Sequence, residues 1–323
     1  MGGAPMTIRF RPYFDSDFLR IRDFLSQSAR EADGSPTRQP WNWWIDRWSF
    51  TATVSCAMHR TTHEEWAERL GLWEQWDAPT RTWQLLGLVL NEGERRGEAF
   101  IQSGCAELPA PVLEEMFDFI EAHTDTSGGV TLRLDPRFPQ RMAIAERRGF
   151  ARTDWQEPLS WLGVDAAPAL ALPPGYRLVE AHMVDVREKA ALHARAFGYT
   201  DQPEFVQSAA LAFARLPLTP DYRGDLDLLV LDAAGTPVAM AGFWYDAANR
   251  WGALEPLGTD PQHRRLGLAR SLIGEGMRRM VQLAGARGER LDGMWVGSDQ
   301  PFYLAVGFAV QNRWSVWQKA LPR

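Results

Sequence analysis

The sequence contains only two cysteines among its 323 residues. Two thiols are too few for a disulfide framework and too few for a zinc site built of four thiolates. We therefore expect a reducing, cytoplasmic environment, with Cys56 and Cys105 as small buried apolar side chains. We also expect no metal site, because His59 and His63 lack the glutamate and the third ligand of a helical zinc motif.

Long apolar runs and an excess of basic residues are also missing. No stretch reaches about 18 apolar residues, and the first residues show no basic region followed by an apolar core, so we expect neither a membrane span nor a signal peptide. The net charge of −6 argues against a nucleic-acid partner. With 45% apolar and 24% charged residues, the composition is that of an ordinary globular protein.

The chain is long enough for two domains, and its two halves follow one plan. A segment rich in proline and small residues, 164–175, lies between them. Each half is predicted to begin with a strand and an amphipathic helix and to end with a short helix, the dipeptide Gly-Phe and a last strand. The two endings, Gly149-Phe150 and Gly307-Phe308, are 158 residues apart. The sequence therefore predicts a duplicated α+β domain, in which a mixed, mostly antiparallel sheet is flanked by helices.

The periodicity of apolar residues predicts the individual elements. The expected strands are 8–11, 70–73, 82–90, 98–102 and 130–134 in the first half, and 176–179, 226–232, 238–245, 252–257 and 291–296 in the second. The expected helices include 17–26, 111–123, 184–197 and 268–284.

The most informative segment leads from the strand 252–257 through a loop with arginine and glycine into the helix 268–284. The free N–H groups and the dipole of a helix start favour an anion. Gly267 permits close approach of the backbone, and Arg264 and Arg265 add positive charge. The loop therefore predicts a pyrophosphate site, although it matches neither the dinucleotide-binding glycine motif nor the phosphate loop of nucleotide triphosphatases.

The motif Arg264-x-x-Gly267-x-Ala269 resembles the pyrophosphate loop of the GNAT superfamily of acyl-CoA-dependent N-acetyltransferases. The segment from Tyr303 to Phe308 resembles the Tyr-x-x-x-Gly-Phe ending of that family's last helix. The resemblance covers the second half directly and the first half through the repeat, as in the two-domain mycothiol synthase family. It implies tandem GNAT folds: a degenerate copy at 6–163, a linker at 164–175 and a catalytic copy at 176–323.

The resemblance also implies acetyl-CoA as co-substrate and a set of residues that hold it. Backbone groups after the fourth strand of the copy pair with the pantetheine amides, and the loop with the start of the helix holds the pyrophosphate. The residues implied are Leu257, Gly258, Thr259, Arg264, Arg265, Leu266, Gly267, Leu268, Ala269 and Arg270. The usual asparagine ahead of the last helix is absent, and Ser298 stands in that region as a helix cap.

Acyl transfer to an amine needs a group that accepts the ammonium proton and a group that protonates the leaving thiolate. Glu255, on the fourth strand, is the candidate base, and Tyr303 is the candidate acid. Two other interpretations remain open: Glu255 as an exposed strand residue or ion-pair partner, and Tyr303 as a core tyrosine.

The first half lacks this chemistry. An offset of 158 places the loop at 106–111, where two prolines remove N–H donors and Glu107 adds negative charge. The same offset places Ala145 at the position of Tyr303. We expect this copy to be structural or to shape the substrate site.

The resemblance implies transfer of an acetyl group from acetyl-CoA to a primary amine of a small molecule by direct attack. Two alternatives stay open: a non-catalytic protein that binds or senses acyl-CoA, and an acetyltransferase that acts on a protein amine. We expect a monomer or a homodimer without nucleic-acid or membrane partners.

Overall fold

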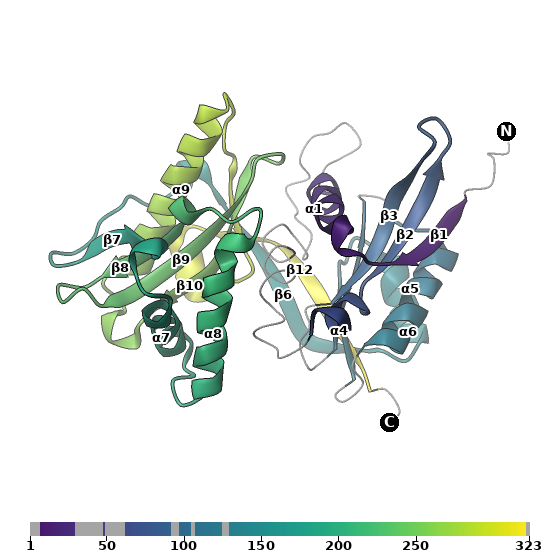
Figure 1. The fold of residues 1–323 in the computed structure, drawn as a ribbon, viewed down its shortest axis with the longest axis horizontal. Helices are drawn as coiled ribbons and strands as arrows, with labels where there is room; N and C mark the ends of the chain where they lie inside the picture. The colour runs from purple at the N-terminus through teal and green to yellow at the C-terminus, as the bar shows by residue number, and fades with distance from the viewer. Residues whose placement is uncertain are drawn as a thin grey trace. The chain divides into compact units, whose positions relative to one another are not determined.

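The computed structural model describes residues 7–29, 48, 62–91, 97–104, 107–124 and 129–320 (Figure 1). The predictions for Cys56, Cys105 and His59 fall outside these residues. The described chain divides into two compact units. The first holds the described residues up to Glu157 together with 313–320, and the second holds Pro158–Asn312.

The first unit has a six-stranded sheet in the order β1-β2-β3-β4-β5-β12. All its neighbouring strands are antiparallel except β4 and β5. Helices α5 and α6 pack against one face of this sheet through an apolar cluster. Its elements are β1 (Ile8–Pro12), α1 (Phe18–Gln27), α4 (His63–Ala67), β2 (Gly71–Asp77), β3 (Thr82–Asn91), β4 (Glu98–Ser103), α5 (Ala110–His123), β5 (Val130–Leu134) and α6 (Pro139–Arg147).

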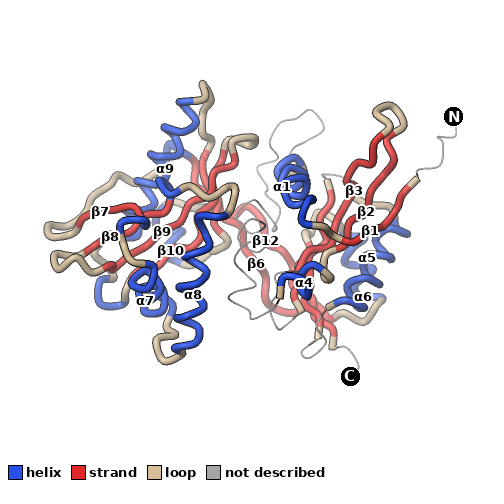
Figure 2. Tube along the Cα trace, in the orientation of Figure 1, coloured by secondary structure: helices blue, strands red, loops and turns tan. Residues whose placement is uncertain are grey.

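The second unit repeats this plan with the order β6-β11-β10-β9-β8-β7, in which only β10 and β11 are parallel. Helices α7 and α8 lie on one side of the sheet and α9 on the other (Figure 2). Its elements are β7 (Arg177–Glu180), α7 (Val186–Phe197), α8 (Pro203–Arg215), β8 (Asp227–Leu231), β9 (Pro237–Asp246), β10 (Trp251–Thr259), α9 (Leu268–Ala286), β11 (Gly293–Val296) and α10 (Pro301–Val306). The predicted α+β class, with a mixed and mostly antiparallel sheet, is confirmed.

The two halves exchange their last strands, β6 (Ala151–Gly163) and β12 (Ala309–Lys319). The end of β6 pairs with β11, from Ser160 opposite Val296 to Gly163 opposite Gly293. The end of β12 pairs with β5 of the first unit. The boundaries 6–163 and 176–323 therefore do not coincide with the compact units. Alternation of side chains predicts that a segment is a strand but does not specify its partner.

The segment 164–175 packs closely on α9 and is part of the second unit. The Ser271 hydroxyl donates to the carbonyl of Ala171 at 2.9 Å and accepts its N–H at 3.2 Å. A Cβ atom at Gly274 would lie 2.1 Å from the carbonyl oxygen of Pro168, so only glycine permits this approach. The segment thus fixes the position of the helix start that carries the predicted anion site.

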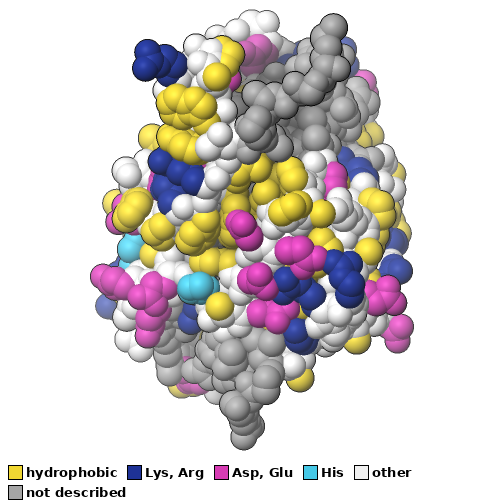
Figure 3. Space-filling model, turned by 90° about the vertical axis from the view of Figure 1, so that its right-hand side faces the viewer, with side chains coloured by type: hydrophobic (Ala, Val, Ile, Leu, Met, Phe, Trp, Pro, Cys, Tyr) yellow, Lys and Arg dark blue, Asp and Glu magenta, His cyan; other side chains and the backbone are white. Residues whose placement is uncertain are grey.

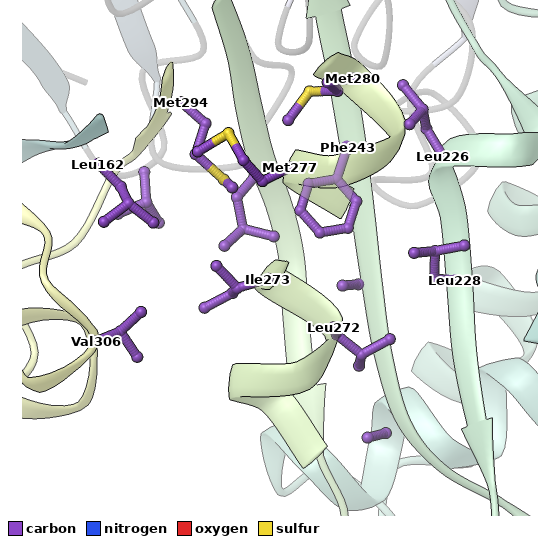
Figure 4. Close-up of a cluster of buried hydrophobic side chains, with 14 of the residues drawn as sticks. Leu162, Leu226, Leu228, Phe243, Leu272, Ile273, Met277, Met280, Met294 and Val306 are labelled. Atoms are coloured by element: carbon purple, nitrogen blue, oxygen red, sulfur yellow. The ribbon is translucent and has the colours of Figure 1, made fainter. Parts of the chain in front are cut away.

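The core of the second unit lies between α9 and the sheet (Figure 4). Buried side chains of α9, including Ile273 and Met277, pack with Phe243 of β9. A Cβ atom at Gly276 would lie 2.2 Å from the Phe243 ring, so this glycine brings helix and strand together. Each fully buried apolar side chain contributes about 1.5–3 kcal/mol. Among the described helices, none has the length and hydropathy needed to cross a membrane.

The outer strand of the first sheet, β1, carries charged residues. Arg9 and Arg11 donate to the buried carboxylate of Glu74 on β2 at 2.8 and 3.0 Å. The large apolar side chains of Phe10 and Phe14 are nevertheless exposed, and Figure 3 shows apolar side chains gathered among charged ones on one face of the molecule. Charges on an outer strand oppose edge-to-edge association with other sheets.

Candidate functional site

The site begins where β10 and β11 separate. The two strands pair from Trp251 opposite Gly293 to Ala253 opposite Trp295, and no further pair joins them in the described chain. Strand β10 continues for six residues to Thr259. Its edge beyond Ala253 is therefore open on the side of β11, and an extended ligand with amide groups can hydrogen-bond to it as an added strand.

A bulge interrupts β10 at the same place. Leu254 pairs with Phe243 and Leu257 with Ala241, so Glu255 and Pro256 both lie opposite Gly242. A Cβ atom at Gly242 would be 2.7 Å from the carbonyl oxygen of Glu255.

The indole N–H of Trp244 donates to the carbonyl oxygen of Glu255 at 3.2 Å. The close approach at Gly242 and the hydrogen bond from Trp244 thus hold the bulge in one position. Bulges are frequent next to active sites.

The loop after β10 is the predicted anion site. It runs through a short 3-10 helix, Pro261–His263, and enters α9 at Leu268. Arg265 and Gly267 have left-handed backbones, with φ of 63° and 79°. The N–H groups of the first turn of α9 lack carbonyl partners within the helix, as at every helix start, and Arg264–Gly267 are exposed beside them.

Side-chain contacts fix this loop. The Arg264 guanidinium donates to the carbonyls of Thr259 and Ala196, at 3.3 and 3.1 Å. His263 hydrogen-bonds to the hydroxyl of Tyr176 at 2.9 Å and is partly buried. Arg264 thus ties the loop to the end of α7, and the side chains of Arg265 and Arg270 are exposed in the same segment.

Asp260 begins the loop and is held on two sides. Its carboxylate accepts the N–H of Gln262 at 3.0 Å and forms an ion pair with Arg195 at 2.5 Å. Burial alone would raise the pKa of Asp260, but these hydrogen bonds and the charge of Arg195 outweigh it, and the pKa lies below its usual value. The carboxylate therefore stays charged and keeps the loop attached to α7.

The predicted cofactor residues come together in one region. Leu257 is half-buried against the core of the unit, and a Cβ atom at Gly258 would lie 2.9 Å from the side chain of Ala196 on α7. The end of β10, the loop and the first turn of α9 thus follow one another directly within the second unit. Ser298 was predicted to cap the last helix, but Gln300 is the N-cap of α10, and the Ser298 hydroxyl accepts the N–H of Gln300 at 3.3 Å one turn ahead of the helix.

Glu255 lies on β10 just beyond its last pair with β11, and Tyr303 lies on α10, the helix that follows β11. Leu254 packs in the α9 core, so alternation places the exposed Glu255 on the α7 side. Tyr303, on α10, packs against the α9 core, and its ring is 5.7 Å from that of Phe308. Burial raises the pKa of the Tyr303 phenol, and the negative charge of Glu255 raises it further. The two candidate groups therefore influence each other electrostatically.

A buried polar network on the α7 side was not predicted from the sequence. The Lys189 ammonium forms an ion pair with Asp227 at 2.5 Å, and the Tyr222 hydroxyl donates to the same carboxylate at 3.0 Å. One helical turn further along α7, His193 hydrogen-bonds to the Tyr199 hydroxyl. The sequence held one sign of this network. Lys189 is one of only two lysines in the chain, and it precedes His193 by four residues on a predicted helix, so the two side chains share a helix face.

Burial, and secondarily the charge of Lys189, lowers the pKa of His193 to about 4. Burial also lowers the pKa of Lys189, against the raising effect of Asp227. The imidazole is thus neutral at physiological pH.

No group of three side chains suited to a metal ion occurs among the described residues. His63, for which we expected no metal role, pairs with Asp15 at 2.6 Å.

In both units of this α+β architecture the sheet opens between its two parallel strands. Residues 191–308 match the acetyltransferase (GNAT) family, and this match runs from α7 to Phe308. The matched residues lie within the second unit, and the chain as a whole has the tandem GNAT fold.

Solved structures with the same fold align with nearly the whole chain. A tandem GNAT protein from the clavulanic acid biosynthesis pathway is 16% identical, with 98% of this chain and 100% of that chain covered and a TM-score of 0.61. A GCN5-related N-acetyltransferase from Sphaerobacter thermophilus is 14% identical, with 97% and 95% covered and a TM-score of 0.57. No curated protein sequence matches this chain. At these identities the structures establish the fold alone.

Proposed function

We propose that the protein is an N-acetyltransferase that transfers an acetyl group from acetyl-CoA to a primary amine of a small molecule by direct attack. The observation that carries this proposal is the opening between β10 and β11 next to the exposed N-terminus of α9. An elongated ligand with amides at one end and a diphosphate at the other is complementary to such a surface.

The residues of the second unit fit this co-substrate. The open edge of Leu257–Thr259 would pair with the pantetheine amides, and the N–H groups of Leu266–Arg270 would hold the pyrophosphate. The side chains of Arg265 and Arg270 are exposed there and add positive charge. Arg264, predicted from the motif to bind phosphate, also holds the loop in shape through its hydrogen bonds. Bound acetyl-CoA supplies the activated thioester.

The chemistry assigned to this chain is the movement of protons. As the amine attacks the thioester carbonyl, a C–N bond forms and the C–S bond breaks. The carboxylate of Glu255 accepts the proton that the ammonium loses, directly or through a water molecule. The Tyr303 phenol, whose pKa is raised by burial and by Glu255, stays protonated until the C–S bond breaks and then gives its proton to the thiolate sulfur. The second proton that the nitrogen loses on becoming an amide returns to the Tyr303 oxygen.

Steady-state kinetics with an amine panel test the chemical roles. We expect Tyr303→Phe and Glu255→Gln to lower kcat by roughly 10²-fold or more. The affinity for CoA, measured by calorimetry, should stay within about twofold, because neither side chain belongs to the pyrophosphate loop. A normal kcat in both variants would contradict the assignment.

A matched pair of glycine variants tests the cofactor site. Gly267 and Gly288 lie at the two ends of α9, both have positive φ, and a Cβ atom at either would meet nothing within 4 Å. Gly267→Val should abolish CoA binding because its side chain would stand in the open space proposed for the pyrophosphate, whereas Gly288→Val should cost only backbone strain of roughly 1–2 kcal/mol. Equal CoA affinity in the two variants would contradict the site.

Two outcomes would replace the proposed reaction. Tight CoA binding without thiol release for any amine would identify a binding or sensing protein. Thiol release only with peptide or protein amines would identify a protein acetyltransferase.

A further inference from the structure

The first unit contains the same opening in its sheet. Strands β4 and β5 pair in parallel only at Glu98 with Thr131 and at Ala99 with Leu132. Strand β4 continues for four residues to Ser103 without further pairing to β5 in the described chain. This opening corresponds by position to the one between β10 and β11.

A side chain of the protein fills the opening in the first unit. Arg141 of α6 is only 1% exposed. Its guanidinium donates to the carbonyl of Ile101 at 3.0 Å, to the hydroxyl of Ser103 at 2.5 Å and to the carboxylate of Glu107 at 3.0 Å. Ile101 and Ser103 belong to the part of β4 that pairs with β3 but not with β5, so Arg141 binds the strand edge that the second unit leaves open.

The start of α5 completes this arrangement. The carboxylate of Glu107 accepts the N–H of Leu108 at 3.0 Å as well as the Arg141 Nε–H. Pro109 and Pro111 at the helix start have no N–H groups to offer an anion. A carboxylate therefore stands at the helix start, where the second unit exposes N–H donors.

The surroundings of the guanidinium suit its charge. Its central carbon lies 4.1 Å from the ring centre of Phe138, a cation–π geometry. Five N–H groups in a planar fork allow arginine to meet a carbonyl, a hydroxyl and a carboxylate at once, which a lysine cannot do.

We propose that the opening in the first unit is a guanidinium-binding site occupied by the chain's own Arg141, which closes this unit to acyl-CoA. The ligand class is a planar cation with several N–H donors, and its recognition groups are Ile101, Ser103, Glu107 and Phe138. This goes beyond the proposed function, because it assigns a site in the unit without the pyrophosphate loop.

Chemical rescue tests the proposal. Arg141→Ala removes the guanidinium and leaves its acceptors buried, so we expect the Tm to fall by roughly 5–15 °C. Methylguanidinium at a few millimolar, far below denaturing concentrations, should raise the Tm of this variant by several degrees. Methylammonium at the same concentration should not, because it has one charge centre and no planar fork.

Arg147→Ala provides the control, since Arg147 lies on the same helix with a side chain that is 62% exposed. Its Tm should be near that of the wild type and insensitive to methylguanidinium. Rescue that is absent, or equal in the two variants, would overturn the proposal. If Arg141→Ala does not fold in bacteria, expression in the presence of methylguanidinium should restore soluble protein, and failure to do so would also count against it.

The stoichiometry of CoA binding is a second measurement. Two equivalent CoA sites per wild-type chain would overturn the closure of the first unit. The rescue experiment involves no CoA, so its outcome is independent of the proposed acetyl transfer.

Discussion

The buried imidazole of His193 makes stability depend on pH in a defined window. Burial and the charge of Lys189 lower its pKa to about 4, whereas in the unfolded chain its pKa is about 6.5. Between these values the unfolded chain binds a proton that the folded chain does not. The stability associated with His193 is therefore fully present above pH 6.5 and is lost as the pH falls towards 4.

The size of the effect follows from the two pKa values. A difference of about 2.5 units corresponds to at most about 3 kcal/mol, of which about 2 kcal/mol is lost between pH 7 and pH 5. Carboxylates with lowered pKa values, such as Asp260 and Glu275, lose their contributions at lower pH than this. The window from pH 7 to pH 5 therefore isolates histidine titration.

The assay is urea unfolding followed by tryptophan fluorescence at pH 7 and pH 5. His193→Gln keeps a hydrogen-bonding group beside the Tyr199 hydroxyl but does not titrate. We expect the free energy lost between the two pH values to be about 2 kcal/mol smaller in this variant than in the wild type. His182→Gln, at a histidine whose side chain is 65% exposed, is the control and should retain the wild-type slope. Equal slopes in His193→Gln and the wild type would refute the reasoning.

Two further predictions concern the sheet of the second unit. Trp244→Phe removes the N–H that donates to the carbonyl of Glu255. Kinetics should show a roughly tenfold lower kcat with unchanged CoA affinity. An unchanged kcat would show that the bulge does not need this hydrogen bond. Gly276→Ala forces a Cβ atom against the Phe243 ring and should cost about 1–3 kcal/mol in urea unfolding. Gly285→Ala, on the same helix but facing open space, should stabilise the protein or leave it unchanged, and equal losses in both would contradict the packing argument.

Local patterns in the sequence predicted the elements well. The helix expected at 268–284 is observed at Leu268–Ala286, because its apolar stripe matches the packing face against the sheet. Pro256 marked the break in β10, since proline cannot donate to a neighbouring strand.

Features set by tertiary contacts were not predictable in the same way. Arg141 looks like an ordinary helical arginine in the sequence, and its role depends on acceptors up to 40 residues away. Lys189 likewise finds Asp227 only through the fold. The alternation of side chains does not predict the exchange of β6 and β12, because either strand could pair with the edge of either sheet.

The exchanged strands reverse the order in which the two sheets are completed during synthesis. The first sheet needs Ser315–Lys319 of β12 beside β5, and these residues follow every other strand in the chain. The second sheet receives β6 from a segment that is made before its own β7. Domains of a growing chain generally fold from the N-terminus onward. In this protein the N-terminal sheet is finished last, and until then its β5 edge stays available to other strands.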